Sequence, residues 1–320
     1  MSGLVPGGLA RGSGGPADGE LLAGDRAYRA GDLGSAEQHY RRAAKLAPED
    51  PAPRVGLVRV KLASGELPTE YGAAPRDPKV AALVAEVGKI LRKSGEYGPA
   101  YVELGRLLLV QGKADEALRN LERGAALGAD DPEAQSSLGL ALVATGKAEA
   151  AVARLRRAAE LDPDAAERFT NLGTVLMVRE DVDGALAAFR RAAELAPNEA
   201  RTLADLGAVY LALNRAVEAK PYLERAVALA PDRATFLTNL GYAQQKVGDL
   251  ASAVATLKKA VTVDPKLGSA WLNLGACYVD QGKLDDAERA FETARKIDPT
   301  DPRAKESLDD LAEIRKKLGK

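Results

Sequence analysis

The chain has 320 residues, and an aromatic content of 4% together with abundant Ala, Leu, Arg and Glu favours helices over strands. Its 45 Lys and Arg residues nearly balance 46 Asp and Glu residues, which excludes a global positive field that would attract nucleic acid or an anionic membrane. One cysteine and one histidine exclude an internal disulfide and a multi-thiolate zinc site. We therefore expect an all-α protein with no metal and no cofactor.

Residues 1–16 are rich in glycine and contain no apolar run of signal-peptide length. No apolar stretch elsewhere in the sequence is long enough to span a membrane. We expect a disordered N-terminus over residues 1–16 and a cytoplasmic location.

Residues 17–97 contain two irregular units. The first covers residues 17–50 and carries small and aromatic residues at the spacing of the later units. The second covers residues 51–97 and is longer by an insertion at 66–77, where prolines forbid a continuous helix. We expect helix to resume at about Pro78, a residue favoured in the first helical turn. The second unit is therefore predicted to be degenerate, with a loop at its turn.

Residues 98–301 form six blocks of 34 residues that align without a gap. A leucine is followed by a glycine in every block, and an alanine and a large apolar residue recur further along. The glycine column consists of Gly105, Gly139, Gly173, Gly207, Gly241 and Gly275. Such columns indicate two helices per block that cross closely at small residues. Prolines after the second helix of most blocks, such as Pro163 and Pro197, are expected to stop it.

Turns within the blocks carry a residue suited to positive φ, namely Gly112, Gly146, Asn214, Gly248 and Gly282. Residues 302–320 form a last amphipathic segment. We expect it to be a capping helix with a solvated outer face.

The last full block resembles the tetratricopeptide repeat family, a 34-residue helix-turn-helix unit. The resemblance rests on Trp271, Leu274, Gly275, Tyr278, Ala287, Phe291, Ala294 and Pro299. It implies a right-handed superhelical solenoid of antiparallel helix pairs. In this family the first helices of successive repeats line a concave groove, where extended or helical peptides of partner proteins dock.

The resemblance also places candidate partner-binding residues in that groove. One column is a ladder of short polar side chains, whose amides can donate to and accept from a peptide backbone. The expected binding residues are Glu103, Arg106, Ser137, Leu140, Asn171, Thr174, Asp205, Asn239, Tyr242 and Asn273. An alternative stays open, because asparagine is common at this position of the family and need not bind anything.

Four other features of the sequence are candidates for a site. Tyr71, within the 66–77 insertion, is a candidate loop contact, although the insertion is equally well explained as a tolerated one. A basic column on the second helices, including Arg123 and Arg157, has acidic neighbours, which argues against nucleic-acid binding. Cys277 is expected to be a buried apolar residue, and His39 a surface residue.

The sequence contains no Gly-rich phosphate loop, no His–carboxylate pair and no nucleophile motif, so we expect no enzyme activity. We expect an adaptor or scaffold that binds one or more partner proteins through peptide-like segments. The alternative is a dedicated chaperone or assembly factor for one client protein. The sequence does not encode the partner's identity or the oligomeric state.

Overall fold

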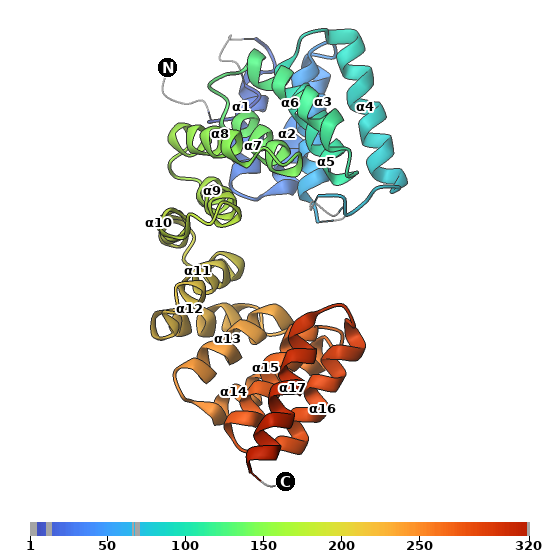
Figure 1. Ribbon diagram of the computed structural model, residues 1–320. Coiled ribbons are helices and arrows are strands. Elements are labelled where there is room, and N and C mark those ends of the chain that lie inside the picture. The colour runs from blue at the N-terminus through green and yellow to red at the C-terminus, as the bar shows by residue number, and fades with distance from the viewer. Residues whose placement is uncertain (1–4, 11–14, 66, 68–70, 319–320) are drawn as a thin grey trace. The chain divides into compact units, whose positions relative to one another are not determined.

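The computed structural model describes residues 5–10, 15–65, 67 and 71–318. In these ranges it contains 17 α-helices and no strand (Figure 1). The predicted all-α fold is confirmed. The chain divides into two compact units, residues 1–180 (unit 1) and 181–320 (unit 2), which are described separately.

In unit 1 the helices follow one another through short turns, except across the insertion. They are α1 (Asp18–Arg29), α2 (Leu33–Leu46), α3 (Pro51–Ala63), α4 (Pro78–Ser94), α5 (Gly98–Val110), α6 (Ala114–Leu127), α7 (Pro132–Ala144), α8 (Ala148–Leu161) and α9 (Ala166–Val178). In unit 2 they are α10 (Val182–Leu195), α11 (Ala200–Ala212), α12 (Ala216–Leu229), α13 (Ala234–Lys246), α14 (Leu250–Val263), α15 (Gly268–Asp280), α16 (Leu284–Ile297) and α17 (Pro302–Lys317).

Helices in each unit pack in two layers. Each helix contacts the next one along the chain, and the first helix of a repeat also contacts the first helix of the following repeat. In unit 1 this second set of contacts runs α1–α3–α5–α7–α9, and in unit 2 it runs α11–α13–α15–α17. The fold is therefore an all-α solenoid of antiparallel helix pairs, with the first helices forming one layer.

Within each unit, glycines of this column mark the points where paired helices cross. A Cβ atom added to Gly105 in α5 would lie 2.3 Å from Cγ of Leu121 in α6. In unit 2 a Cβ on Gly241 would lie 2.5 Å from Cγ of Leu257. Because these distances are shorter than van der Waals contact, only glycine allows the two helices to approach this closely.

The turns inside the repeats use left-handed backbone. The expected glycines take positive φ, and Asn214 does so at 58°. Glu180 occupies the same position in the fifth repeat with φ 61°, which the sequence analysis did not anticipate. This conformation costs a residue with a Cβ about 1 kcal/mol. In the neighbouring repeats glycine or asparagine adopts the same conformation at a smaller cost in free energy.

Helix ends follow local chemistry. Asp50 and Asp77 cap α3 and α4 by accepting hydrogen bonds from backbone N–H groups, and each is followed by proline in the first turn. α8 ends at Leu161, two residues before Pro163, as expected for a proline stop. Local chemistry therefore sets the start of α3 and α4 and the end of α8.

The insertion after α3 returns to the end of α5. Glu66 and residues 68–70 lie outside the described part, and the remaining loop residues make two backbone bonds to α5. Gly72 N donates to Leu109 O at 2.9 Å, and Ala74 N donates to Val110 O at 3.0 Å. Carbonyls in the last turn of a helix have no partner inside the helix. The loop supplies partners for two of them.

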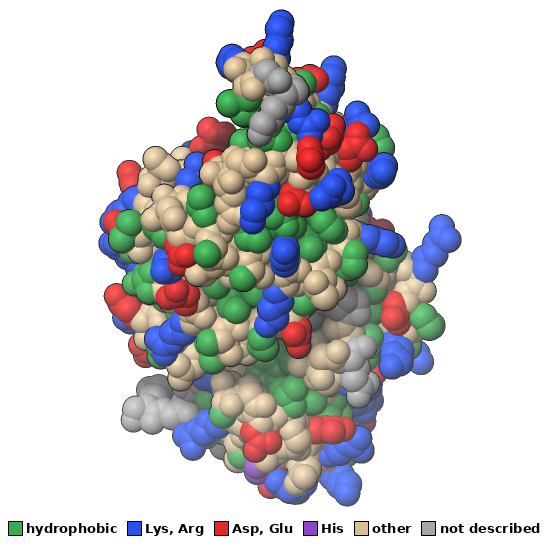
Figure 2. Space-filling view, turned by 90° about the horizontal axis from the view of Figure 1, so that it is seen from below, with side chains coloured by type: hydrophobic (Ala, Val, Ile, Leu, Met, Phe, Trp, Pro, Cys, Tyr) green, Lys and Arg blue, Asp and Glu red, His purple; other side chains and the backbone are tan. Residues whose placement is uncertain are grey.

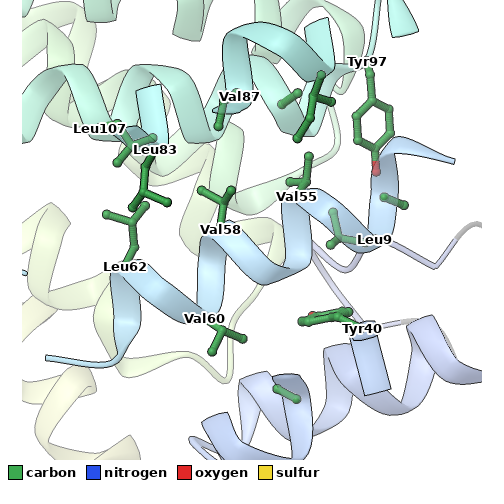
Figure 3. Close-up of a cluster of buried hydrophobic side chains, with 14 of the residues drawn as sticks. Leu9, Tyr40, Val55, Val58, Val60, Leu62, Leu83, Val87, Tyr97 and Leu107 are labelled. Carbon is green, nitrogen blue, oxygen red and sulfur yellow. The ribbon is translucent and has the colours of Figure 1, made fainter. Parts of the chain in front are cut away.

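In unit 1 an apolar core joins α1 to α5, and part of it is shown in Figure 3. Val58 and Leu62 of α3 lie beside Leu83 and Val87 of α4 and Leu107 of α5 (Figure 3). In unit 2 a second core extends from α13 to α17 and includes Phe291. These cores hold α1, α3, α5, α13 and α15, which are first helices of their repeats.

Candidate functional site

The expected partner-binding residues fall on the first helices of both units. Glu103 and Arg106 lie on α5, Ser137 and Leu140 on α7, and Asn171 and Thr174 on α9 of unit 1. Unit 2 carries Asp205 on α11, Asn239 and Tyr242 on α13, and Asn273 on α15. The burial and the hydrogen-bond partners of these side chains differ between the two units.

Glu103 is a wholly buried carboxylate, not an open rung of a ladder. Its Oε1 accepts a 2.7 Å hydrogen bond from Nε of Arg59, and its Oε2 lies 3.1 Å from Nη1 of Arg106. Its side chain is 0% exposed and that of Arg59 is 4% exposed. Burying both charges is tolerable because they are paired and hydrogen-bonded. Glu103 therefore holds two arginines in place and is closed to a ligand.

Ion pairs continue across the first helices of unit 1. Arg106 lies 3.5 Å from Glu133 of α7, which accepts a 2.8 Å bond from Arg168 of α9. Burial opposes ionisation of Glu133, but the attraction of Arg106, Arg168 and Arg59 outweighs it and lowers the pKa of Glu133. Glu133 therefore stays charged and links three helices.

The network also reaches back to the first repeat. Arg29 at the end of α1 donates a 2.5 Å bond to Asp162, which follows α8. These residues are 133 positions apart in the sequence. The first helices, residues 5–8 and the turns after α1 and α8 line a cavity of about 440 Å³, with Tyr28, Arg106 and Glu167 among its lining residues. We call this hollow face of α1, α3, α5, α7 and α9 the unit 1 groove.

Residues 5–10 lie in the unit 1 groove. The sequence led us to expect disorder over residues 1–16. The expectation is wrong for 5–10, whereas residues 1–4 and 11–14 lie outside the described part. Leu9 is 2% exposed, and its N–H donates a 2.7 Å bond to Oδ2 of Asp25. Arg59 Nη1 donates a 2.7 Å bond to Gly7 O. Buried apolar contact and charged partners order the segment despite its glycines.

Sequence reasoning missed Asp25 and Arg59, although a signal was present. Arg59 lies one 47-residue repeat before Arg106, and Asp25 lies one 34-residue repeat before Arg59. The three residues therefore share one column of the first helices, and all three line the groove. Carrying the Arg106 column into the two irregular repeats would have found them.

The other expected residues of unit 1 are mostly engaged within the protein. Ser137 is buried and donates to Glu133 at 3.4 Å, and Asn171 donates to Ser136 Oγ at 3.2 Å. Thr174 donates to the carbonyl of Thr170 at 2.9 Å. Leu140 is 38% exposed. In unit 1 the polar side chains of this column are thus bonded to groups of the protein itself.

In unit 2 the ladder is open. Asp205, Asn239 and Asn273 are half-buried, and among the described residues neither asparagine amide has a hydrogen-bond partner. Asp205 lies 3.9 Å from Nε of Arg201, and burial raises its pKa to about 6. Tyr242 is half-buried, with Nζ of Lys246 5.2 Å from its ring centroid. These side chains retain hydrogen-bonding capacity that the protein does not use.

Tyr71 of the insertion is 55% exposed, and its hydroxyl donates to Gly112 O at 3.2 Å. Cys277 is buried, and burial raises its pKa to about 11, so it is a neutral thiol near pH 7. Within the described residues no group of His, Cys, Asp and Glu is arranged to hold a metal ion. No helix in the same part of the chain combines the length and apolar composition needed to cross a membrane.

Comparison with solved structures supports the fold. YrrB, titled a TPR protein with an unusual peptide-binding site, aligns with 59% of this chain and 97% of its own at 24% identity and a TM-score of 0.50. A chain of the APC/C hetero-tetramer Cut9-Hcn1 also aligns with this protein. The alignment covers 92% of this chain and 55% of the matched chain, at 15% identity and a TM-score of 0.72. PilF of Pseudomonas aeruginosa covers 67% of this chain and 97% of its own, with 18% identity and a TM-score of 0.59.

A search of curated proteins finds no significant match to this chain. Models of the tetratricopeptide repeat, by contrast, match residues 21–70, 98–123, 139–178, 165–232, 204–262 and 245–311. These matches cover most of the chain and coincide with the observed helix pairs. The chain therefore belongs to the tetratricopeptide repeat family, whose fold is a scaffold for protein–protein interaction.

Proposed function

We propose that this protein is an adaptor that binds extended or helical segments of partner proteins on its layer of first helices, with unit 2 supplying the open surface. The alternative is a chaperone or assembly factor that shields one client by the same surface. Neither role requires a catalytic group. YrrB shares the fold and is titled for a peptide-binding site, and we extend peptide binding to this chain as a proposal.

The free amides of Asn239 and Asn273 carry this proposal. They lie one repeat apart, are half-buried and have no partner within the described residues. A carboxamide offers both donor and acceptor atoms, which matches the alternating N–H and C=O groups of a peptide backbone. Partly buried polar groups without a partner gain most from a ligand that satisfies them. A peptide main chain is therefore the ligand that suits this ladder.

The charges on the second helices support a protein partner over a nucleic acid. Arginines of the basic column there are paired with carboxylates, Arg157 with Asp130 at 2.8 Å and Arg191 with Glu194 at 3.2 Å. Figure 2 shows acidic and basic side chains interspersed on the face it presents. Paired cations attract phosphate weakly, because their field is largely cancelled.

The test replaces both ladder asparagines, Asn239→Ala with Asn273→Ala, in the full chain. Proteins captured from a lysate by the wild type would be identified by mass spectrometry, and the affinity of each purified partner measured by calorimetry. Each lost hydrogen bond costs about 1 kcal/mol, so we expect an affinity loss of roughly 30-fold with unchanged helical content. The matched control, Lys258→Ala with Thr262→Ala on the exposed face of α14, should bind like the wild type.

Partners that bind the ladder variant as tightly as the wild type would contradict the proposed site. The adaptor role would be supported by several partners whose binding depends on different residues of the first helices. A single client that aggregates when the protein is absent would instead support the chaperone alternative.

A further inference from the structure

We propose that residues 5–10 are the resident ligand of the unit 1 groove, and that a partner peptide enters this groove only by displacing them. The segment then acts as an autoinhibitory strap. It also reports the ligand chemistry: a short peptide with a bend at Gly-Gly followed by a leucine-like residue. The inference rests on the proposed function for the existence of a partner peptide, but the docking of the segment is tested without any partner.

The segment is held by its main chain, as a peptide ligand would be. Asp25 Oδ2 accepts from Leu9 N at 2.7 Å and from Ala10 N at 2.9 Å, while Arg59 Nη1 donates to Gly7 O at 2.7 Å. The acceptor and the donor lie on the first helices of successive repeats, α1 and α3. Main-chain bonds of this kind do not depend on the ligand's side chains, so the same two residues can hold another peptide.

Leu9 is the apolar anchor. Its side chain is 2% exposed and belongs to the apolar core with Tyr40, Val55 and Tyr97. Figure 3 shows Leu9 between α3 and the ring of Tyr40. Burying a leucine side chain is worth about 1.5–3 kcal/mol, which favours docking of this short segment despite its two glycines. An incoming peptide needs an apolar residue here to compete.

Two glycines are required at the bend. Gly7 has φ +70°, and a Cβ on Gly8 would lie 2.7 Å from Oδ2 of Asp25 and 2.8 Å from the carbonyl oxygen of Val5. Both distances are too short for a carbon atom. Any side chain at position 8 therefore pushes the backbone away from Asp25, which makes the bend specific for glycine.

The buried carboxylate of Asp25 requires an occupant of the groove that supplies N–H donors. Asp25 is 3% exposed, and its Oδ1 already accepts from the hydroxyl of Tyr40 at 2.9 Å. Its Oδ2 has the two amides of the segment as partners. Leaving a buried carboxylate oxygen without partners is costly. A peptide that displaces residues 5–10 must therefore bring its own pair of N–H groups to Asp25.

The strap competes from within the same chain. Residues 11–17 join Ala10 to the start of α1 at Asp18. A tether this short holds its segment at an effective concentration on the order of millimolar. A free peptide with the same contacts is therefore excluded at micromolar concentrations unless the strap is released.

Gly8→Ala in the full-length chain tests the docking. The matched control is Gly19→Ala in α1, where an added Cβ meets nothing within 4 Å. Amide hydrogen exchange at Leu9 and Ala10, followed by NMR, should be at least about tenfold faster in Gly8→Ala than in the wild type, since both bonds to Asp25 are strained. Gly19→Ala should exchange like the wild type. Unprotected Leu9 and Ala10 amides in the wild type would overturn the proposal.

A labelled peptide tests the competition. A fluorescein-labelled peptide of residues 1–16 is titrated, by anisotropy, against the wild type, Gly8→Ala and Leu9→Asp, the last of which releases the strap by removing its anchor. We expect saturable binding to both released variants and at least about tenfold weaker binding to the wild type, because the tethered strap competes at millimolar effective concentration. The same peptide with Gly8→Ala should not bind.

Equal binding to wild type and released variants, or no binding to the released variants, would refute the strap as a displaceable ligand. Failure of the proposed function would give a different result. The Asn239→Ala, Asn273→Ala variant of unit 2 would then still bind the partners, and the amide exchange rates of Leu9 and Ala10 would be the same as in the wild type.

Discussion

Asp205 places a carboxylate in a ladder whose neighbouring rungs, Asn239 and Asn273, are amides. Burial raises its pKa from 3.8 to about 6, while Arg201 at 3.9 Å lowers the pKa and Glu199 raises it. The folded state therefore holds the proton more tightly than the unfolded chain between about pH 4 and pH 6. In this window the stability of unit 2 falls as pH rises, because the native state must give up a proton that it favours.

Asp205→Asn removes this penalty. We expect the variant to be more stable than the wild type at pH 7 by up to about 1 kcal/mol, a modest value because the side chain is 35% exposed and partly screened by solvent. The difference should vanish near pH 4. Urea unfolding at pH 7 and pH 4 measures it, with Asp232→Asn in an exposed loop as the control. An Asp205→Asn advantage that is the same at both pH values would count against the raised pKa.

At the scale of elements, the distance between paired helices depends on one close contact between a glycine and a leucine. Gly241 of α13 faces Leu257 of α14, and the same glycine–leucine pair recurs as Gly105–Leu121, Gly139–Leu155 and Gly207–Leu223. The contact requires that the glycine have no Cβ and that the leucine fill the space this leaves. Both residues belong to periodic columns, so this part of the packing is legible in the sequence.

Gly241→Ala should therefore destabilise unit 2 by about 1–3 kcal/mol through overpacking. Gly268→Ala in α15 is the matched control, since its Cβ would meet Ile297 at an ordinary 3.8 Å. Denaturant unfolding gives both values, and we expect the control within about 0.5 kcal/mol of the wild type. Combining Gly241→Ala with Leu257→Ala should cost less than the two single changes together, because the smaller residue relieves the clash. Additive costs would show that the two residues are not coupled.

At the scale of the whole molecule, repeats within each unit contact their neighbours along the chain, so damage stays local. The ion pairs of unit 1 are the exception, because Arg29 and Asp162 join the first repeat to the end of α8. The buried pair Arg59–Glu103 lies inside this arrangement. Its loss should affect several helices of unit 1 at once.

Glu103→Gln leaves Arg59 buried without its counter-ion, and we expect unit 1 to lose roughly 3 kcal/mol. Hydrogen exchange by mass spectrometry should show faster exchange over α3, α5 and α7, with α13–α16 unchanged. Glu122→Gln, on the exposed face of α6, is the control and should change neither. Replacing both partners, Arg59→Met with Glu103→Leu, should recover much of the loss, since no lone charge stays buried. Uniform acceleration along the whole chain would contradict this local effect.

The sequence by itself determined the class of fold, the repeat length and most helix ends, because glycine, alanine and proline columns act through contacts within one repeat. It also placed Asn239 and Asn273 one repeat apart on first helices. It did not determine that Glu103 is buried between two arginines, that Asp25 and Arg59 line the groove, or that Leu9 is buried in the adjoining apolar core. Those facts depend on partners far apart in the chain, such as Gly7 with Arg59 and Arg29 with Asp162. Only the stacking of successive repeats brings such residues together. The 34-residue pattern of the sequence does not indicate these contacts, because it describes positions within one repeat.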